Sequence, residues 1–145
     1  MAERMFEDDF MDVQSGLVSL CLEATEGQAV QDVYAYASIE GNMTVFNAFF
    51  RVGGQVLPLN QVVTDDDIRW QVLKLAQGDL AGLRELCAAA DRPCPTQIRG
   101  HYASTGGYKA SYAYDPIVGT EDGIAPGTTF ANWIHAVAAG NDDLA

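Results

Sequence analysis

The first part of the chain carries apolar residues at steps of three and four, which is the spacing of a single stripe along an α-helix. The stripe consists of Phe6, Phe10, Val13, Leu17, Leu20, Cys21 and Ala24. It predicts a helix over about residues 3–26. The other faces of this helix carry Glu7, Asp8, Asp9 and Asp12. Because carboxylates in the first turns suit the positive end of the helix dipole, we interpret them as a solvated face.

Residues 32–60 change to an alternation of apolar and polar positions, which is typical of β-strands. The dipeptides Gly41-Asn42 and Gly53-Gly54 interrupt the alternation, and each is a strong signal for a two-residue hairpin turn. The pattern therefore predicts three antiparallel strands that share one apolar face. That face would hold Val33, Ala35, Ala37, Ile39, Phe46, Ala48, Phe50, Val52, Leu57 and Leu59.

The opposite face of these three strands is mixed in character. It would hold Tyr34, Tyr36, Val45, Asn47, Phe49 and Arg51. Two interpretations stay open, because this face is either half covered by the rest of the chain or open to a partner. If it is open, Tyr34, Tyr36 and Phe49 are the expected aromatic anchors for a partner protein. Pro58 predicts that the third strand is an edge strand or leaves the sheet at that point.

A second helical stripe begins after Thr64, which we expect to cap the helix, with Asp67 at the capping-box position. The stripe consists of Ile68, Val72, Leu75, Ala76, Leu80, Leu83, Cys87 and Ala90. It continues through Gly78 and therefore predicts one long helix. Asp91 and Pro93 are expected to end that helix.

Residues 97–115 predict a second hairpin, in which tyrosines crowd one face. A three-residue loop at Thr105–Gly107 would pair Ser104 with Tyr108. In the same register Gly100 lies opposite Tyr112, so that the ring of Tyr112 would cover the glycine. The other face of the hairpin would then be small, basic and polar. It would hold Arg99, His101, Ala103, Lys109, Ser111 and Ala113.

Residues 115–128 have two prolines, three glycines and no periodicity, so they predict a long loop, which carries Glu121 and Asp122. A short helix follows in "TFANWIHAV", and residues 140–145 predict a frayed tail. The inward residues of this short helix would be Phe130, Trp133, Ile134 and Val137.

The order of these elements is helix, three strands, helix, two strands, helix. It predicts the α+β class, with a five-stranded antiparallel sheet covered by helices. The 145 residues show no internal repeat and no second hydrophobic segment set apart by a linker, so we expect a single domain over residues 1–145.

The charge of the chain narrows the classes of partner. Twenty carboxylates against eight lysines and arginines leave a formal net charge of -12. We expect such a protein to repel nucleic acid and membrane surfaces and to attract basic proteins. The cysteines Cys21, Cys87 and Cys94 are odd in number, and the first two fit core positions of a reduced protein. The acidic, periodic N-terminus is unlike a signal peptide, so we expect a cytoplasmic location.

The chain shows no motif for catalysis or for a cofactor. Neither His101 nor His135 stands in a metal-ligand spacing, and six residues rather than two separate Cys87 from Cys94. A nucleophile elbow, a phosphate loop and a dinucleotide fingerprint are all missing from the sequence. We therefore expect no metal, no organic cofactor and no enzymatic activity. A deep pocket around His101 would favour an enzyme instead.

Four stretches together resemble the YezG-like immunity proteins of bacterial polymorphic toxin systems. They are "VYAYASIEGNMTVFNAFFRVGGQV", the long helix that follows it, "PTQIRGHYASTGGYKASYAYDP" and "FANWIHAV". In that family a strand with tyrosines precedes an aromatic-rich hairpin, and a later hairpin ends in an aromatic-x-Tyr-acid strand. Here that closing strand is Tyr112-Ala113-Tyr114-Asp115, and the likeness covers most of residues 28–137.

The resemblance implies a protein that binds a cognate secreted toxin domain and blocks it, without catalytic residues of its own. An acidic inhibitor would suit a basic nuclease, because complementary charge speeds association. The leading candidates for toxin contacts are two acidic clusters, in a protein that we expect to be a monomer or a homodimer. The clusters are Asp65, Asp66 and Asp67 at the start of the long helix, and Glu121 and Asp122 in the long loop.

An alternative of a different class is an acidic type III secretion chaperone, which binds an effector segment along a dimer. Such chaperones share the same order of elements and dimerise through an apolar face of the long helix beyond its core stripe. In this sequence the positions off the stripe are mostly charged or amide residues, and Trp70 is the exception.

Overall fold

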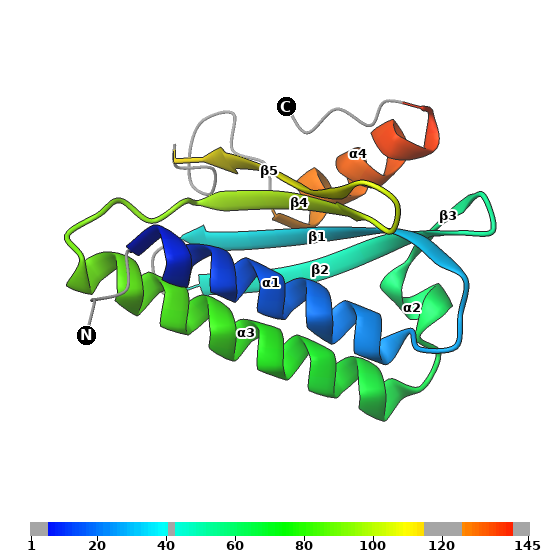
Figure 1. Cartoon of the computed structure of the whole chain (residues 1–145), viewed down its shortest axis with the longest axis horizontal. Coiled ribbons are helices and arrows are strands. Elements are labelled where there is room, and N and C mark those ends of the chain that lie inside the picture. Colours follow the sequence, from blue (N-terminus) through cyan, green and yellow to red (C-terminus); the bar gives the residue numbers. More distant parts are fainter. Residues whose placement is uncertain (1–5, 41–42, 115–125, 141–145) are drawn as a thin grey trace.

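A computed structural model describes residues 6–40, 43–114 and 126–140, and it has three layers (Figure 1). Helices α1 (Phe6–Ala24) and α3 (Asp66–Ala89) cover one face of a five-stranded antiparallel sheet, and α4 (Pro126–Ala138) covers part of the other. The predicted class and order of elements are confirmed. The structure adds one short helix, α2 (Leu59–Val62), between the third strand and α3.

The sheet has the order β3-β2-β1-β4-β5, so that β1 lies at its centre. The strands are β1 (Val30–Glu40), β2 (Met43–Val52), β3 (Gln55–Pro58), β4 (Gln97–Ala103) and β5 (Gly107–Ala113). The predicted two-residue turn at Gly53-Gly54 is confirmed by the register, since Val52 pairs with Gln55. Glu40 pairs with Met43, while Gly41 and Asn42, where the other turn was predicted, lie outside the described residues. Gly53 and Gly54 have φ values of 57° and 83°, which the type I′ turn requires and glycine tolerates best. Pro58 ends an edge strand, as expected.

The main core lies between the sheet and the pair α1 and α3. The residues predicted for the apolar sheet face are buried or half-buried here, from Val33 and Phe50, both fully buried, to Leu57 at the edge. Leu59 also reaches this core, although it does so from α2 rather than from the end of a strand. Small residues on β1 lie opposite larger ones on β2, for example Ala37 opposite Phe46. This pairing lets the sheet face pack closely against the helices.

Two expectations for the long helix are wrong in detail. Its N-cap is Asp65 rather than Thr64. Ile68 and Leu75, which were predicted in the core stripe, are 43% and 56% exposed. The reason is that α3 rests on the sheet through a narrower stripe, so the two residues fall on its outer flank. The buried stripe consists of Val72, Ala76, Leu80, Leu83 and Cys87.

The β4–β5 hairpin has the predicted odd loop and the predicted faces, but its register is shifted by two residues. Tyr102 pairs with Tyr108 and Gly100 pairs with Ala110, so the loop consists of residues 104–106. The side chain over Gly100 is therefore that of Tyr108 and not that of Tyr112. A methyl group built on Gly100 would come within 2.4 Å of the Tyr108 hydroxyl oxygen. A slip of two residues keeps every side chain on its own face, which is why the alternation could not reveal it.

The second face of the sheet carries a smaller core beneath α4. It consists of Tyr34, Tyr36, Phe49, Phe130, Trp133 and Val137, with Val56 and Ile134 at its margin. The Tyr34 and Phe49 rings stack at 4.5 Å, and the Trp133 ring meets Phe49 edge-on at 4.9 Å. The inward residues expected for the last helix are thereby confirmed. Tyr34, Tyr36 and Phe49 are at most 1% exposed, so the idea that they form an open surface for a partner is wrong.

Replacement of Trp133 by alanine should remove most of this second core. We expect Trp133→Ala to lower the free energy of unfolding by about 3–5 kcal/mol, because the indole is almost fully buried among three aromatic rings. The matched control is Trp70→Ala, since Trp70 is 62% exposed and its loss should cost at most about 0.5 kcal/mol. Urea unfolding followed by circular dichroism measures both. Equal losses in the two variants would contradict the assignment of a second core.

Candidate functional site

The three aspartates at the start of α3 have different surroundings. The Asp65 carboxylate accepts hydrogen bonds from the backbone N–H groups of Asp67 and Ile68, at 2.9 and 3.2 Å. Asp66 forms an ion pair with Arg69 one turn later, and the backbone carbonyl of Val63 also accepts a bond from that arginine. Asp65 therefore has a structural task as the helix cap, while Asp66 and Asp67 are free of that task and exposed. Glu121 and Asp122 lie outside the described residues.

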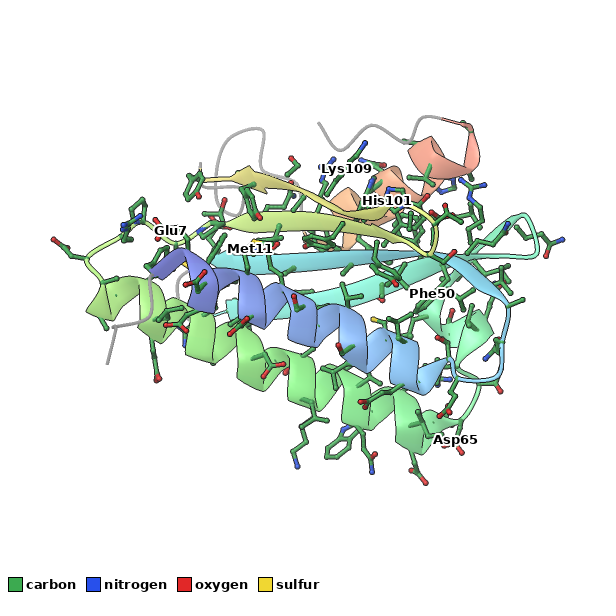
Figure 2. The ribbon with its side chains drawn as sticks, in the orientation of Figure 1. Glu7, Met11, Phe50, Asp65, His101 and Lys109 are labelled. Atoms are coloured by element: carbon green, nitrogen blue, oxygen red, sulfur yellow. The ribbon has the colours of Figure 1, made fainter. Side chains whose placement is uncertain are left out.

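The two acidic helix starts lie at opposite ends of the helical layer, because α1 and α3 run antiparallel. Figure 2 shows Glu7 at one end of this layer and Asp65 at the other. Glu7 and Arg92 form an ion pair at 3.1 Å, which ties the start of α1 to the segment after α3. Negative charge is thus gathered at the start of each helix, whereas the rest of α3 carries Arg69, Lys74 and Arg84 beside Asp79 and Glu85.

One member of the basic polar face predicted for the second hairpin, His101, contacts Asp32 of β1. The Asp32 carboxylate contacts His101 Nε2 at 2.7 Å and Arg51 Nε at 3.3 Å, and both His101 and Asp32 have side chains 17% exposed. The His101 ring stacks on Tyr34 at 4.4 Å, so the histidine is part of the aromatic stack. Figure 2 shows His101 and Lys109 on the side of the sheet that carries α4.

The contacts of this histidine–carboxylate pair give it a structural role. The imidazole and the carboxylate satisfy each other above a stacked ring, and Arg51 shares the charge of Asp32. Three cavities of about 410, 320 and 180 Å³ lie elsewhere, and none of the three is lined by His101. The deep pocket around His101 that would favour an enzyme is therefore not among these three cavities.

The surroundings of the cysteines determine how reactive their thiols are. Cys21, Cys87 and Cys94 are free thiols. Burial raises the pKa of Cys21 to about 12. Burial and then a hydrogen bond with Cys87 raise the pKa of Cys94 to about 12. Thiols with such pKa values are protonated at neutral pH and are poor nucleophiles and metal ligands. Among the described residues, no group of three or more His, Cys, Asp and Glu side chains is placed to hold a metal ion.

The outer surface of the helical layer combines exposed apolar side chains with carboxylates. Five of the seven large hydrophobic residues that the described structure exposes belong to α1 and α3. These five are Met11, Leu22, Ile68, Trp70 and Leu75. Glu7, Asp8, Asp12, Glu23, Asp66 and Asp67 are exposed on or beside the same helices. Helix α3 also carries Arg69, Lys74 and Arg84, and Lys74 lies over the ring of Trp70, so the charges on α3 are of both signs. Exposed apolar side chains that lie close together are typical of a protein-binding surface.

The sequence pattern missed most of these apolar residues as surface features. It placed Ile68 and Leu75 in the core and drew attention only to Trp70. The width of the second helical stripe could have revealed them as surface residues. On a helical wheel Ile68 and Leu75 lie at one margin of the stripe, beside Val72 and away from the other buried residues. The residues that were proposed instead, Tyr34, Tyr36 and Phe49, belong to the second core.

Comparison of the sequence with models of known protein families found no match, and comparison with curated proteins found none either. Within the residues that the structure describes, no helix combines the length and the apolar character that crossing a membrane requires.

The cap at Asp65 yields a direct test of how the acidic cluster divides its roles. We expect Asp65→Ala to lower the free energy of unfolding by about 1 kcal/mol, because two backbone N–H groups of α3 lose their acceptor. Asp65→Asn keeps an acceptor oxygen and should change stability by only a few tenths of that amount. Urea unfolding measures both variants. If the asparagine variant is as destabilised as the alanine variant, the carboxylate acts through its charge and not as a cap.

Proposed function

We propose that this chain is an immunity protein that binds a cognate secreted toxin domain, a basic nuclease, and blocks its active cleft. The observation that carries the proposal is the helical layer, where exposed apolar side chains stand among carboxylates. The likeness to YezG-like immunity proteins supports the same function. The acidic surface would speed encounter with a basic partner, and the apolar side chains would supply much of the binding energy.

The anchors differ from those that the sequence suggested. Tyr34, Tyr36 and Phe49 are held in the second core by α4, so a toxin would reach them only if α4 left the sheet. Met11 and Leu22 on α1, together with the exposed residues of α3, take their place as candidate anchors. Asp66 and Asp67 remain candidates for steering, because neither is needed as the cap of α3.

The proposal predicts that a gene beside this one encodes a secreted toxin domain, and that domain is the binding partner used in the test. The purified toxin domain should bind this protein. Cells that express the toxin domain should survive only when they also make this protein. We expect the pair of changes Asp66→Asn and Asp67→Asn to slow association and to reduce its salt dependence, because the local negative field is weaker. The melting temperature should stay nearly unchanged, since both residues are exposed.

The matched control for this experiment is the pair Gln55→Lys and Asn132→Lys. It raises the net charge by the same amount as the asparagine pair, but at exposed positions at the start of β3 and on α4, outside α1 and α3. We expect it to change the association rate less than the asparagine pair does. Equal rates and salt slopes in both pairs would contradict a specific role for the acidic helix start. A wild-type protein that neither binds nor neutralises the toxin would overturn the proposed function itself.

A secretion chaperone remains the second candidate, and one specific observation favours it. Ile68 and Leu75 expose an apolar flank on α3, next to a groove of about 180 Å³ that they form with Leu20 and Ala24 of α1. Such a flank would suit dimerisation through the long helix. The chaperone function predicts a dimer that Leu75→Lys splits, whereas the immunity function predicts that the wild type and Leu75→Lys sediment alike. Analytical ultracentrifugation separates the two outcomes.

A further inference from the structure

The two edges of the sheet differ in how well they are protected. The edge strand β3 has four residues, ends in Pro58 and continues directly into α2. Strand β5, at the other edge, has seven residues and no proline, and no described residue pairs with its outer side. Backbone N–H and C=O groups along such an edge can pair with a further strand. The β5 edge is therefore the place where this sheet can accept another chain.

A groove of about 320 Å³ runs beside this edge, between α1 and the β4–β5 hairpin. Figure 2 labels Met11, which contributes to the α1 side of the groove. The groove is lined by Met11, Ser15, Val18, Ser19, Leu22, Tyr102, Gly107 and Tyr108. Met11 and Leu22 are 40% and 37% exposed, so apolar surface is available to whatever enters it.

The wall of the groove is held in place by a buried polar network. Gln14 is 1% exposed, and its Oε1 atom accepts hydrogen bonds from the hydroxyls of Tyr108 and Tyr112, at 2.7 and 3.0 Å. Burial and the neighbouring Tyr112 raise the pKa of Tyr108, which keeps its hydroxyl protonated as a donor. Gly100 leaves the space that the Tyr108 ring occupies. The groove is thus formed before any partner arrives, which lowers the entropy that binding must offset.

The rim of the groove is acidic toward the start of α1. Asp8, Asp12, Ser15 and Ser19 follow one another at helical steps of four, three and four, so they lie in one row along α1. The two serines of this row line the groove, and the two aspartates continue it toward the Tyr112 end of β5. A segment that lies along the β5 edge would therefore contact apolar side chains in the groove and carboxylates at one end of the groove. Basic residues at its end would complement them.

We propose that the β5 edge and the groove beside α1 bind an extended segment of the partner protein, which adds to the sheet as a sixth strand. Its alternate apolar side chains fill the groove, and lysine or arginine at its end faces Asp8 and Asp12. Lys109 lies on the opposite face of β5. The residues of the bound segment that alternate with its apolar ones share that face, and they are therefore neutral or acidic. The assignment of this segment to a toxin rests on the proposed function, whereas the geometry does not.

The test uses synthetic peptides, so that it is independent of any toxin. The probe is the decapeptide Lys-Lys-Val-Thr-Val-Thr-Val-Thr-Lys-Lys, mixed at millimolar concentration with the full chain. We expect amide protons of β5 to gain protection from hydrogen exchange, measured by NMR. Three control peptides should give little or no protection: one with valine replaced by glycine, one with lysine replaced by glutamate, and one with the threonines replaced by proline.

Two matched variants locate the site. Ser15→Arg fills the groove and should weaken binding of the probe by about tenfold or more. Gln71→Arg adds the same charge at the groove between α1 and α3 and should leave the affinity within about twofold. Ser19→Arg, on the same rim as Ser15, repeats the blocking test if Ser15→Arg alters the fold.

Three outcomes would overturn the inference. The first is that no β5 amide gains protection. The second is that the glycine peptide binds as well as the valine peptide. The third is that Gln71→Arg weakens binding as much as the arginines in the groove do. If the peptide binds as expected while the neighbouring toxin is not neutralised, the proposed function fails and the groove assignment stands.

Discussion

The central position of β1 is the constraint on which the rest of the structure depends. Seven consecutive residues of this strand, Val33–Ile39, are buried, because neighbouring strands flank it and helices cover both of its faces. Its odd-numbered side chains pack under α1 and α3, whereas Tyr34 and Tyr36 pack under α4. A strand that is buried on both faces joins two cores that would otherwise be separate. Loss of either helical layer would leave half of β1 exposed to water.

The two cores contain apolar and uncharged polar side chains, so the charged side chains lie at the surface. The buried polar side chains are uncharged, and the Asp32 group at the margin of the second core is balanced by Arg51 and His101. Among the residues that the structure describes, most carboxylates lie along α1 and at the start of α3. A basic partner of the kind proposed would relieve the self-repulsion of such a surface. The apolar residues on the same helices then gain burial that folding alone does not provide.

The surfaces of the protein divide into closed and open ones. The part of the second sheet face beneath α4 is closed, since its aromatic residues already pack against one another, and the β3 edge is short and ends in Pro58. The helical layer and the β5 edge are open, and they meet at the groove between α1 and the β4–β5 hairpin. Gln14 links these parts directly, because it belongs to α1 and accepts bonds from two tyrosines of β5. The same network that closes the core at this corner therefore shapes the surface next to it.

The sequence by itself determined the kinds and the order of the main elements, and the sheet face on which the side chains of the strands lie. These properties depend on local periodicity, so Val33 and Phe50 could be assigned to one core and Phe130 and Trp133 to the inward side of the last helix. Alternation is unchanged by a slip of two residues, and so it could not decide whether Tyr108 or Tyr112 covers Gly100. Nor could it show that Ile68 and Leu75 lie outside the buried stripe. Only the tertiary structure decided that the Tyr34 face is covered, because that depends on where α4, far along the chain, packs.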